Sequence, residues 1–174
     1  MTAWRGFIYM NLSDNNSHSI HDRHTETLIK KQVEEFGWFA ALFETEGDSP
    51  SFGYTIGLWK TFGAAELILF GLPPSVIHKI LANIVAEYVE TRTMISERHR
   101  YPNVLDDVDV SFLKVHPGHY PNYLGYGVWY NGRKSFPVFQ VIVPDRNDRF
   151  PWEAEFDHSF NVNEPLLDSL PDDS

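Results

Sequence analysis

Apolar residues recur every three or four positions in two stretches of the chain, a spacing typical of amphipathic helices. The first stretch begins near Ile20 and ends at Gly37, a residue that readily takes the left-handed conformation found after a helix. The second follows Pro73, Pro74 and Ser75, where proline suits the first turn and serine can cap the helix. We therefore predict two main amphipathic helices. The second has a stripe wide enough to cover a sheet, made of Val76, Ile77, Ile80, Leu81, Ile84, Val85, Tyr88 and Val89.

Shorter stretches rich in β-branched and aromatic residues lie between turn residues, and these predict strands. Trp38–Phe43 and Ser51–Leu58 flank a polar turn and predict a hairpin. Glu66–Phe70 is almost entirely apolar, as expected of a central strand covered on both faces. Val108–Val115 alternates in the manner of a half-buried strand, and Phe136–Val143 is the last predicted strand. The strands thus occur in runs rather than alternating with helices.

Other regions lack a long regular pattern. Residues 1–19 are expected to be irregular, and so is Arg92–Asp107, which has no clear period. Tyr120–Tyr130 is aromatic and broken by glycine, which indicates a short helix, and residues 158–174 are expected to form an acidic, flexible tail. Runs of strands with two flanking helices favour an α+β fold over β-α-β units. We expect one domain over residues 1–174, with a mostly antiparallel sheet and the two main helices packed on it.

Charge and composition narrow the classes of function. The chain has 14 Lys and Arg residues against 24 Asp and Glu residues, a net charge of −10. This balance disfavours direct binding to nucleic acid and favours a basic protein partner. Cysteine is absent, which excludes disulfides, thiolate nucleophiles and cysteine metal sites and favours a reducing compartment. No secretory leader is recognisable and no apolar stretch approaches about 18 to 20 residues, so we expect a cytoplasmic protein that binds no membrane.

Polar side chains within the predicted strands are the first candidates for a ligand site. Glu66 opens the most apolar strand, where a carboxylate must be paired, hydrogen-bonded or shifted toward its neutral form. If these strands are neighbours, one polar pocket for a ligand or for catalysis is expected. The alternative is a buried structural network that fixes the strand register. The residues concerned are Tyr54, Thr55, Glu66 and Gln140.

Loop residues that follow predicted strands are the next candidates for ligand binding. His116 and His119 could take part in proton transfer near neutral pH, although histidine is also an ordinary loop residue. Asp145 opens the run Asp145–Asp148, whose oxygen ligands resemble a calcium loop. The run lacks the glycine and terminal glutamate of such loops, so a turn stabilised by Asp and Asn side chains is favoured.

Three histidines, His18, His21 and His24, recur every third residue near the N-terminus. On a helix this spacing brings imidazoles toward one face, where they could bind zinc, nickel or copper. No carboxylate or cysteine accompanies them at a diagnostic spacing, so solvated histidines are favoured and we expect no metal and no cofactor. No catalytic motif is recognisable either, whether nucleophile elbow, phosphate loop or dinucleotide fingerprint.

Short blocks between Lys30 and Trp152 form a recognisable pattern. The blocks are Gly37-Trp38, Tyr54-Thr-Ile-Gly-Leu58, Glu66-Leu67, Gly71-Leu-Pro73, Gln140, Pro144-Asp145 and Phe150-Pro-Trp152. This pattern resembles an uncharacterised bacterial family, domain of unknown function 4262. Ala65 and Asp148 depart from it, since Pro and Gly look usual at those positions. The resemblance supports the fold class and implies no established activity.

The favoured function is a protein-binding module, and in its specific form a cytoplasmic immunity protein that neutralises a cognate bacterial toxin. A small acidic chain rich in aromatic anchors suits electrostatically steered docking to a basic enzyme. One alternative is a small-molecule-binding domain or hydrolase-like enzyme that uses the pocket around Tyr54, Glu66 and Gln140; another is a symmetric scaffold formed through Tyr120–Tyr130. The candidate partner-binding residues are Glu44, Glu46, Asp48, Asp106, Asp107 and Asp109.

Overall fold

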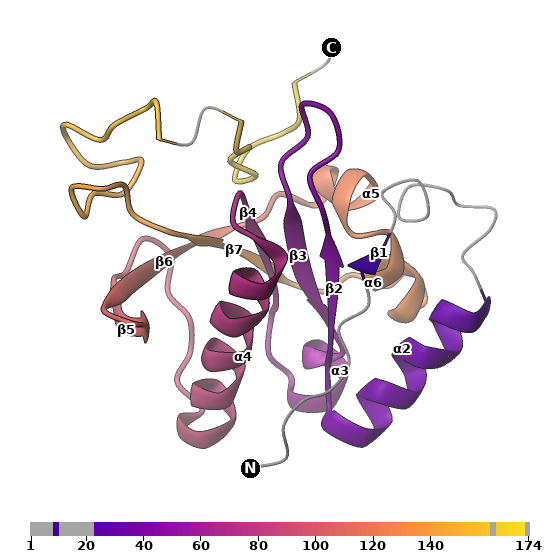
Figure 1. Cartoon of the computed structure of the whole chain (residues 1–174). Helices are drawn as coiled ribbons and strands as arrows, with labels where there is room; N and C mark the ends of the chain where they lie inside the picture. The colour runs from indigo at the N-terminus through magenta and orange to yellow at the C-terminus, as the bar shows by residue number, and fades with distance from the viewer. Residues whose placement is uncertain (1–8, 11–22, 161–162, 173–174) are drawn as a thin grey trace.

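The computed structural model describes residues 9–10, 23–160 and 163–172, and the strands within these ranges form one seven-stranded sheet (Figure 1). Its strand order is β1-β2-β3-β4-β7-β6-β5. Four of the six strand pairs are antiparallel, whereas β1 with β2 and β4 with β7 are parallel. The predicted mostly antiparallel α+β fold is therefore confirmed. The strands are β1 (Tyr9–Met10), β2 (Phe39–Phe43), β3 (Phe52–Ile56), β4 (Glu66–Phe70), β5 (Tyr101–Leu105), β6 (Val108–Lys114) and β7 (Val138–Ile142).

The sheet divides the core into two layers. Successive residues of a strand point to opposite faces, so the fully buried strand β2 contributes Phe39 and Phe43 to one layer and Leu42 to the other. Helix α2 packs on the Phe39 side through Ile29, and α4 packs on the Leu42 side through Ile80. This double coverage explains why the central strands read as almost continuous apolar runs.

The two predicted main helices are present as α2 and α4. Five residues of the predicted apolar stripe of α4 are buried, whereas Val89 at its end is exposed. The aromatic stretch after β6 forms the short helices α5 and α6, as the sequence indicated. Within the described ranges, no helix is long and apolar enough to cross a membrane. The helices are α2 (Arg23–Phe36), α3 (Leu58–Phe62), α4 (Pro74–Thr91), α5 (Tyr120–Tyr123) and α6 (Gly125–Tyr130), with a 3-10 turn at Pro117–His119.

Two local predictions were wrong. Part of the region expected to be irregular forms β5, an edge strand paired with β6, in which Val104 alone is fully buried. With one buried residue in five, the strand shows no alternation of apolar and polar residues, so the sequence pattern does not predict it. The other error concerns the end of the predicted strand Ser51–Leu58, because Leu58 instead begins α3, a five-residue helix between Gly57 and Gly63. Both glycines have positive φ, which lets the chain turn sharply into and out of this helix.

One end of the sheet brings together three segments that are distant in the sequence. Figure 1 shows the C-terminal segment running beside the tip of the β2–β3 hairpin. The loop after β4 joins the same region, because the Gly71 N–H donates to the Ser51 carbonyl at 2.8 Å. The Ser51 hydroxyl donates in turn to the Leu72 carbonyl at 2.6 Å. These bonds fix the hairpin tip to the loop that leads into α4.

Candidate functional site

Glu66 lies at the start of β4, is 1% exposed and accepts hydrogen bonds at both carboxylate oxygens. The Thr55 hydroxyl donates to Oε2 at 2.6 Å. The backbone N–H groups of Gly57 and Trp59 donate to Oε1 at 3.0 and 3.1 Å. These N–H groups lie at the start of α3, where a helix leaves backbone donors without helical partners. Glu66 therefore caps α3 from a neighbouring strand.

The same network joins the two strands. Thr55 Oγ1 accepts the Leu67 N–H at 2.9 Å, so its hydroxyl bonds to Glu66 and to the backbone of β4. Burial raises the pKa of Glu66 to about 7, although the hydrogen bonds from Thr55 and the α3 backbone lower it. The structure thus brings Thr55 and Glu66 together within a network that connects β3, β4 and α3.

Tyr54 and Gln140 direct their polar atoms to other parts of the chain. The buried Tyr54 hydroxyl oxygen accepts the Tyr126 N–H at 3.2 Å, and burial raises the pKa of this phenol. Gln140 is buried on β7 and bonds to the C-terminal segment: its amide N–H donates to the Pro165 carbonyl at 2.8 Å, and its oxygen accepts the Leu167 N–H at 3.0 Å. None of the three cavities described below is lined by Tyr54, Thr55, Glu66 or Gln140.

The two candidate histidines also contact the C-terminal segment, which the sequence assigned to a flexible tail. The His116 backbone N–H donates to the Leu167 carbonyl at 2.7 Å. His119 Nε2 lies 2.7 Å from the Ser169 carbonyl. Leu167 itself is 1% exposed and belongs to the core on the α2 side of the sheet. His116, His119 and Gln140 therefore hold this segment against the fold.

Asp145 organises the loop that follows β7. Its Oδ1 accepts the N–H groups of Asn147 and Arg149 at 2.8 and 3.0 Å, and its Oδ2 accepts the Asp157 N–H at 2.7 Å. Burial raises the pKa of Asp145, but these bonds outweigh burial and hold the pKa below its usual value. The side chain thus stabilises the loop, as the turn interpretation predicts.

The candidate metal ligands are only partly within the described ranges. His18 and His21 lie outside them, and His24 is an exposed residue of α2. Among the residues that the structure describes, no group of three or more His, Cys, Asp or Glu side chains could hold a metal ion.

The two acidic stretches have different surroundings. At the β5–β6 hairpin, Asp109 forms an ion pair with Arg100 at 3.1 Å and accepts the Asn103 N–H at 3.1 Å. Arg100 also pairs with Asp148 at 2.8 Å, so acidic and basic groups are interleaved there. At the β2–β3 turn, the carboxylates are exposed and form no ion pair with any residue in the described part of the chain. We call these three residues the acidic hairpin tip: Glu44, Glu46 and Asp48.

An open polar cavity, the hairpin hollow, lies where the β2–β3 turn, the end of β4 and the C-terminal segment meet. Its volume is about 400 Å³, and its lining includes Asp48, Gly71, Phe160 and Glu164. A second open cavity of about 460 Å³ adjoins it and is lined by Glu44 among others. Three residues line both cavities, namely Thr45, Ser51 and Gly71.

Glu164 is a site residue that sequence reasoning missed. It lies in a polar segment without hydrophobic periodicity, and no motif distinguishes it from the neighbouring acidic residues. In the structure it is partly buried, and this burial raises its pKa to about 7. Only the return of the C-terminal segment to the sheet places this carboxylate in the hollow.

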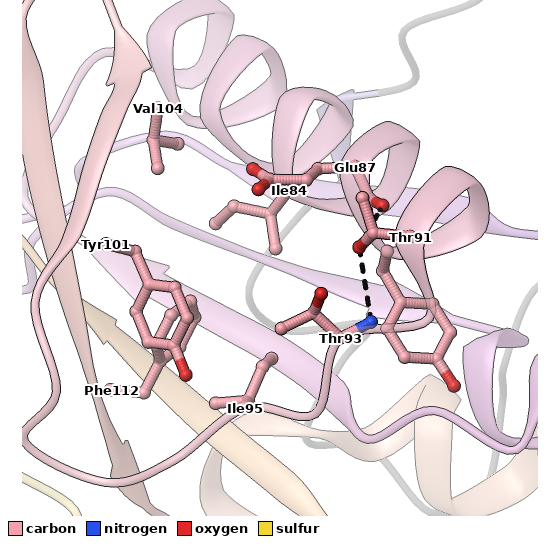
Figure 2. A pocket seen from close by; sticks show the side chains of 9 residues that line it. Ile84, Glu87, Thr91, Thr93, Ile95, Tyr101, Val104 and Phe112 are labelled. Atoms are coloured by element: carbon pink, nitrogen blue, oxygen red, sulfur yellow. Dashed lines mark hydrogen bonds between the residues drawn. The ribbon is translucent and has the colours of Figure 1, made fainter.

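A smaller apolar cavity lies between the C-terminal half of α4 and the strands β5 and β6 (Figure 2). Figure 2 shows Ile84 of α4, Ile95, Tyr101 and Phe112 around it, with Thr93 donating to Thr91 at the rim. Its volume is about 40 Å³, whereas a small apolar guest such as benzene occupies an engineered cavity of about 150 Å³. This cavity is therefore a packing gap rather than a ligand site.

Several of the blocks noted in the sequence lie at the junctions just described, at α3, the end of β4 and the loop after β7. The family model for the domain of unknown function DUF4262 matches residues 32–157. The chain belongs to the DUF4262 family. No curated protein and no solved structure matches it. The DUF4262 match includes Asp48 and Gly71 but ends before Phe160 and Glu164, so the hairpin hollow combines the family domain with a segment beyond the match.

Proposed function

We propose that this DUF4262 protein is a protein-binding module that binds a basic protein partner at the acidic hairpin tip. The observation that carries the proposal is the set of exposed tip carboxylates without ion pairs among the described residues. A carboxylate that is exposed to water has no desolvation cost in the free protein. Because no basic side chain in the described part of the chain neutralises it, it attracts the basic surface of an approaching partner.

The net charge of −10 supports the same direction of binding. A field of this sign speeds the encounter with a basic protein, and the effect decreases as salt screens the charges. At the β5–β6 hairpin, Asp109 contributes less to such an encounter, because it already forms an ion pair with Arg100. We therefore assign the docking face to the β2–β3 hairpin rather than to the β5–β6 hairpin.

In its specific form, the proposal is a cytoplasmic immunity protein whose partner is a basic toxin. The support for this form is the acidic surface and the absence of recognisable catalytic motifs in the sequence. The alternative, a ligand site or hydrolase around Tyr54, Glu66 and Gln140, is less well supported. Each of those side chains already bonds to another part of the protein, and no described cavity opens onto them.

The test is capture of the partner with matched charge variants. Tagged wild-type protein is compared with the triple variant Glu44→Lys, Glu46→Lys, Asp48→Lys in extract of the source cells, and the recovered complexes are weighed by native mass spectrometry. The control variant makes the same change in net charge at exposed helical positions and carries the changes Glu35→Lys, Glu87→Lys and Glu90→Lys.

We expect wild type and control to retain a stoichiometric basic protein and the tip variant to lose it. Co-expression with a toxin would then test the immunity form directly, since only protein with an intact tip should protect the cell. Equal recovery by all three proteins would contradict the proposal. A bound small molecule without any protein partner would instead favour the ligand-binding alternative.

A further inference from the structure

The Glu164 carboxylate lies directly against the backbone of Gly71. A Cβ atom built at Gly71 would overlap Glu164 Oε1, so any side chain there would displace the carboxylate. Gly71 also has a φ of 82°, a conformation that glycine adopts without strain. The glycine therefore makes room for an acidic group at the end of β4, inside the hairpin hollow.

The Glu164 carboxylate has no counter-charge among the residues that the structure describes. Across the described ranges, no hydrogen bond or ion pair involves the Glu164 side chain. Glu66 differs in this respect, because three donors bond to its carboxylate. A partly buried carboxylate loses part of its hydration, and here no hydrogen bond from the described residues replaces the lost water. Binding of a cation in the hollow is therefore strongly favoured.

The rest of the lining suits a planar cation. Among the residues that the structure describes, no lysine, arginine or histidine lines the hairpin hollow or the adjoining cavity. Asp48 provides a second carboxylate in the hollow, and the ring of Phe160, which is 37% exposed, forms part of the wall. The hydrogen bonds of Ser51 with Gly71 and Leu72 fix one side of the cavity, where the hairpin meets the loop after β4.

We propose that the hairpin hollow receives an arginine side chain of the basic partner, whose guanidinium pairs with the Glu164 carboxylate. This proposal rests on the proposed function and names the contact at its centre. Arginine fits better than lysine because its planar guanidinium has five donors for several acceptors and stacks on an aromatic ring such as Phe160. Asp48 stands in the same hollow as a second acceptor.

Pairing with a cation would also change the titration of Glu164. Burial raises the pKa of Glu164 to about 7, and an opposite charge nearby would lower it. Binding below pH 7 therefore releases a proton, and affinity rises as the pH increases from about 6 to 8. Within the described ranges, the titratable groups that line the hollow are Glu164 and Asp48, and Glu44 lines the adjoining cavity.

The first experiment uses N-acetyl-arginine amide as the probe and the full chain as the receptor. The probe is titrated at pH 6, 7 and 8 while amide resonances are followed by NMR, and the uncharged citrulline analogue serves as the ligand control. The protein variants are Glu164→Gln, which keeps the shape of the side chain, and Asp48→Asn, which changes an exposed residue. Glu90→Gln removes one charge from the exposed surface of α4 and is the matched control.

We expect the arginine probe to shift resonances around Gly71 and Glu164, and the citrulline analogue to leave them in place. Glu164→Gln should lower the affinity for the arginine probe by about tenfold or more. The reason is that an adjacent opposite charge lowers a carboxylate pKa by about 1–3 units, and each unit corresponds to a factor of ten in the binding constant. Asp48→Asn should weaken it less, and Glu90→Gln should leave it unchanged. Equal binding of citrulline, or of the probe to Glu164→Gln, would overturn the proposal.

The second experiment measures the affinity of the captured partner for wild type and Glu164→Gln. A loss of about tenfold or more supports the arginine contact. If the probe depends on Glu164 and the partner does not, the hollow is a small-ligand site and the proposal is wrong. Glu164→Gln could leave the affinities for both the probe and the partner unchanged while the triple variant of the acidic hairpin tip loses the partner. In that case the arginine contact is wrong and the proposed function stands without it.

Discussion

Glu66 and Glu164 are both acidic groups whose pKa is raised to about 7 by burial, yet they have opposite surroundings. Glu66 is enclosed at the start of β4, where Thr55 and the first N–H groups of α3 donate to it. Glu164 lies near the other end of the same strand, against Gly71 and beside an open cavity, without a donor among the described residues. A shifted pKa alone therefore does not identify a functional site, and the supply of donors distinguishes the two roles.

The largest expected effect is on Glu66. Replacement by alanine leaves the N–H groups of Gly57 and Trp59 and the Thr55 hydroxyl without their acceptor, so the free energy of unfolding should fall by about 3 kcal/mol or more. Glu66→Gln keeps one carbonyl acceptor and should cost only about 1 kcal/mol. Urea denaturation of both variants measures this. A loss below about 1 kcal/mol for Glu66→Ala would contradict the capping role.

Gly71→Ala should have the next largest effect. A non-glycine residue at positive φ costs about 1–2 kcal/mol, and the new methyl group also displaces the Glu164 carboxylate. The double variant with Glu164→Ala should recover about 0.5 kcal/mol or more of the loss, because the steric conflict is gone and the backbone strain remains. If the two substitutions change the free energy of unfolding by strictly additive amounts, the Glu164 carboxylate does not pack against Gly71.

The pH dependence of stability should separate Glu164 from an ordinary surface carboxylate. Its pKa rises from 4.5 to about 7 on folding, so its contribution is complete below pH 4.5 and is lost as the pH rises through 7. Glu164→Gln should therefore flatten the stability curve between these values, by about 1 kcal/mol after allowance for solvent screening at a partly buried site. Glu90→Gln is the control, and an identical curve for wild type and Glu164→Gln would contradict the effect of burial.

The smallest effect on stability is expected at the acidic hairpin tip. Glu44→Lys, Glu46→Lys and Asp48→Lys together should change the free energy of unfolding by no more than about 0.5 kcal/mol per substitution, because exposed charges contribute little to stability. The same variant should slow association with the captured partner and reduce the salt dependence of its rate, as stopped-flow kinetics would measure. Unfolding of the variant under native conditions would show that the tip has a structural role.

Particular elements show how far sequence patterns lead. The stripe of α4 and the apolar runs of β2 and β4 were predicted because each buries a regular set of positions. The β5 strand and α3 were not, since one has a single fully buried residue and the other is five residues long. Local periodicity contains no information on which distant strands become neighbours, so the parallel pairing of β4 with β7 was also beyond reach.

The candidate site shows the same limit. Thr55 and Glu66 were expected to be neighbours and are hydrogen-bonded, because they lie near the facing ends of adjacent strands. Gln140 was grouped with them, but its amide bonds to the C-terminal segment through Pro165 and Leu167. The position of Glu164 depends on that same segment, whose composition resembles a solvated tail. The contact of the C-terminal segment with the sheet determines both the partners of Gln140 and the position of Glu164, and no local sequence pattern predicts this contact.

The most direct test of the account follows the two carboxyl groups in one sample. Carbon-detected NMR of Glu66 and Glu164 across pH 5 to 9, in free protein and in the complex with the captured basic partner, measures both pKa values. We predict that both lie near 7 in the free protein and that binding lowers the pKa of Glu164 by about 1 unit or more while that of Glu66 stays in place. A complex in which the pKa of Glu164 does not move, or in which that of Glu66 falls instead, would contradict the assignment of Glu164 to the partner and Glu66 to the fold.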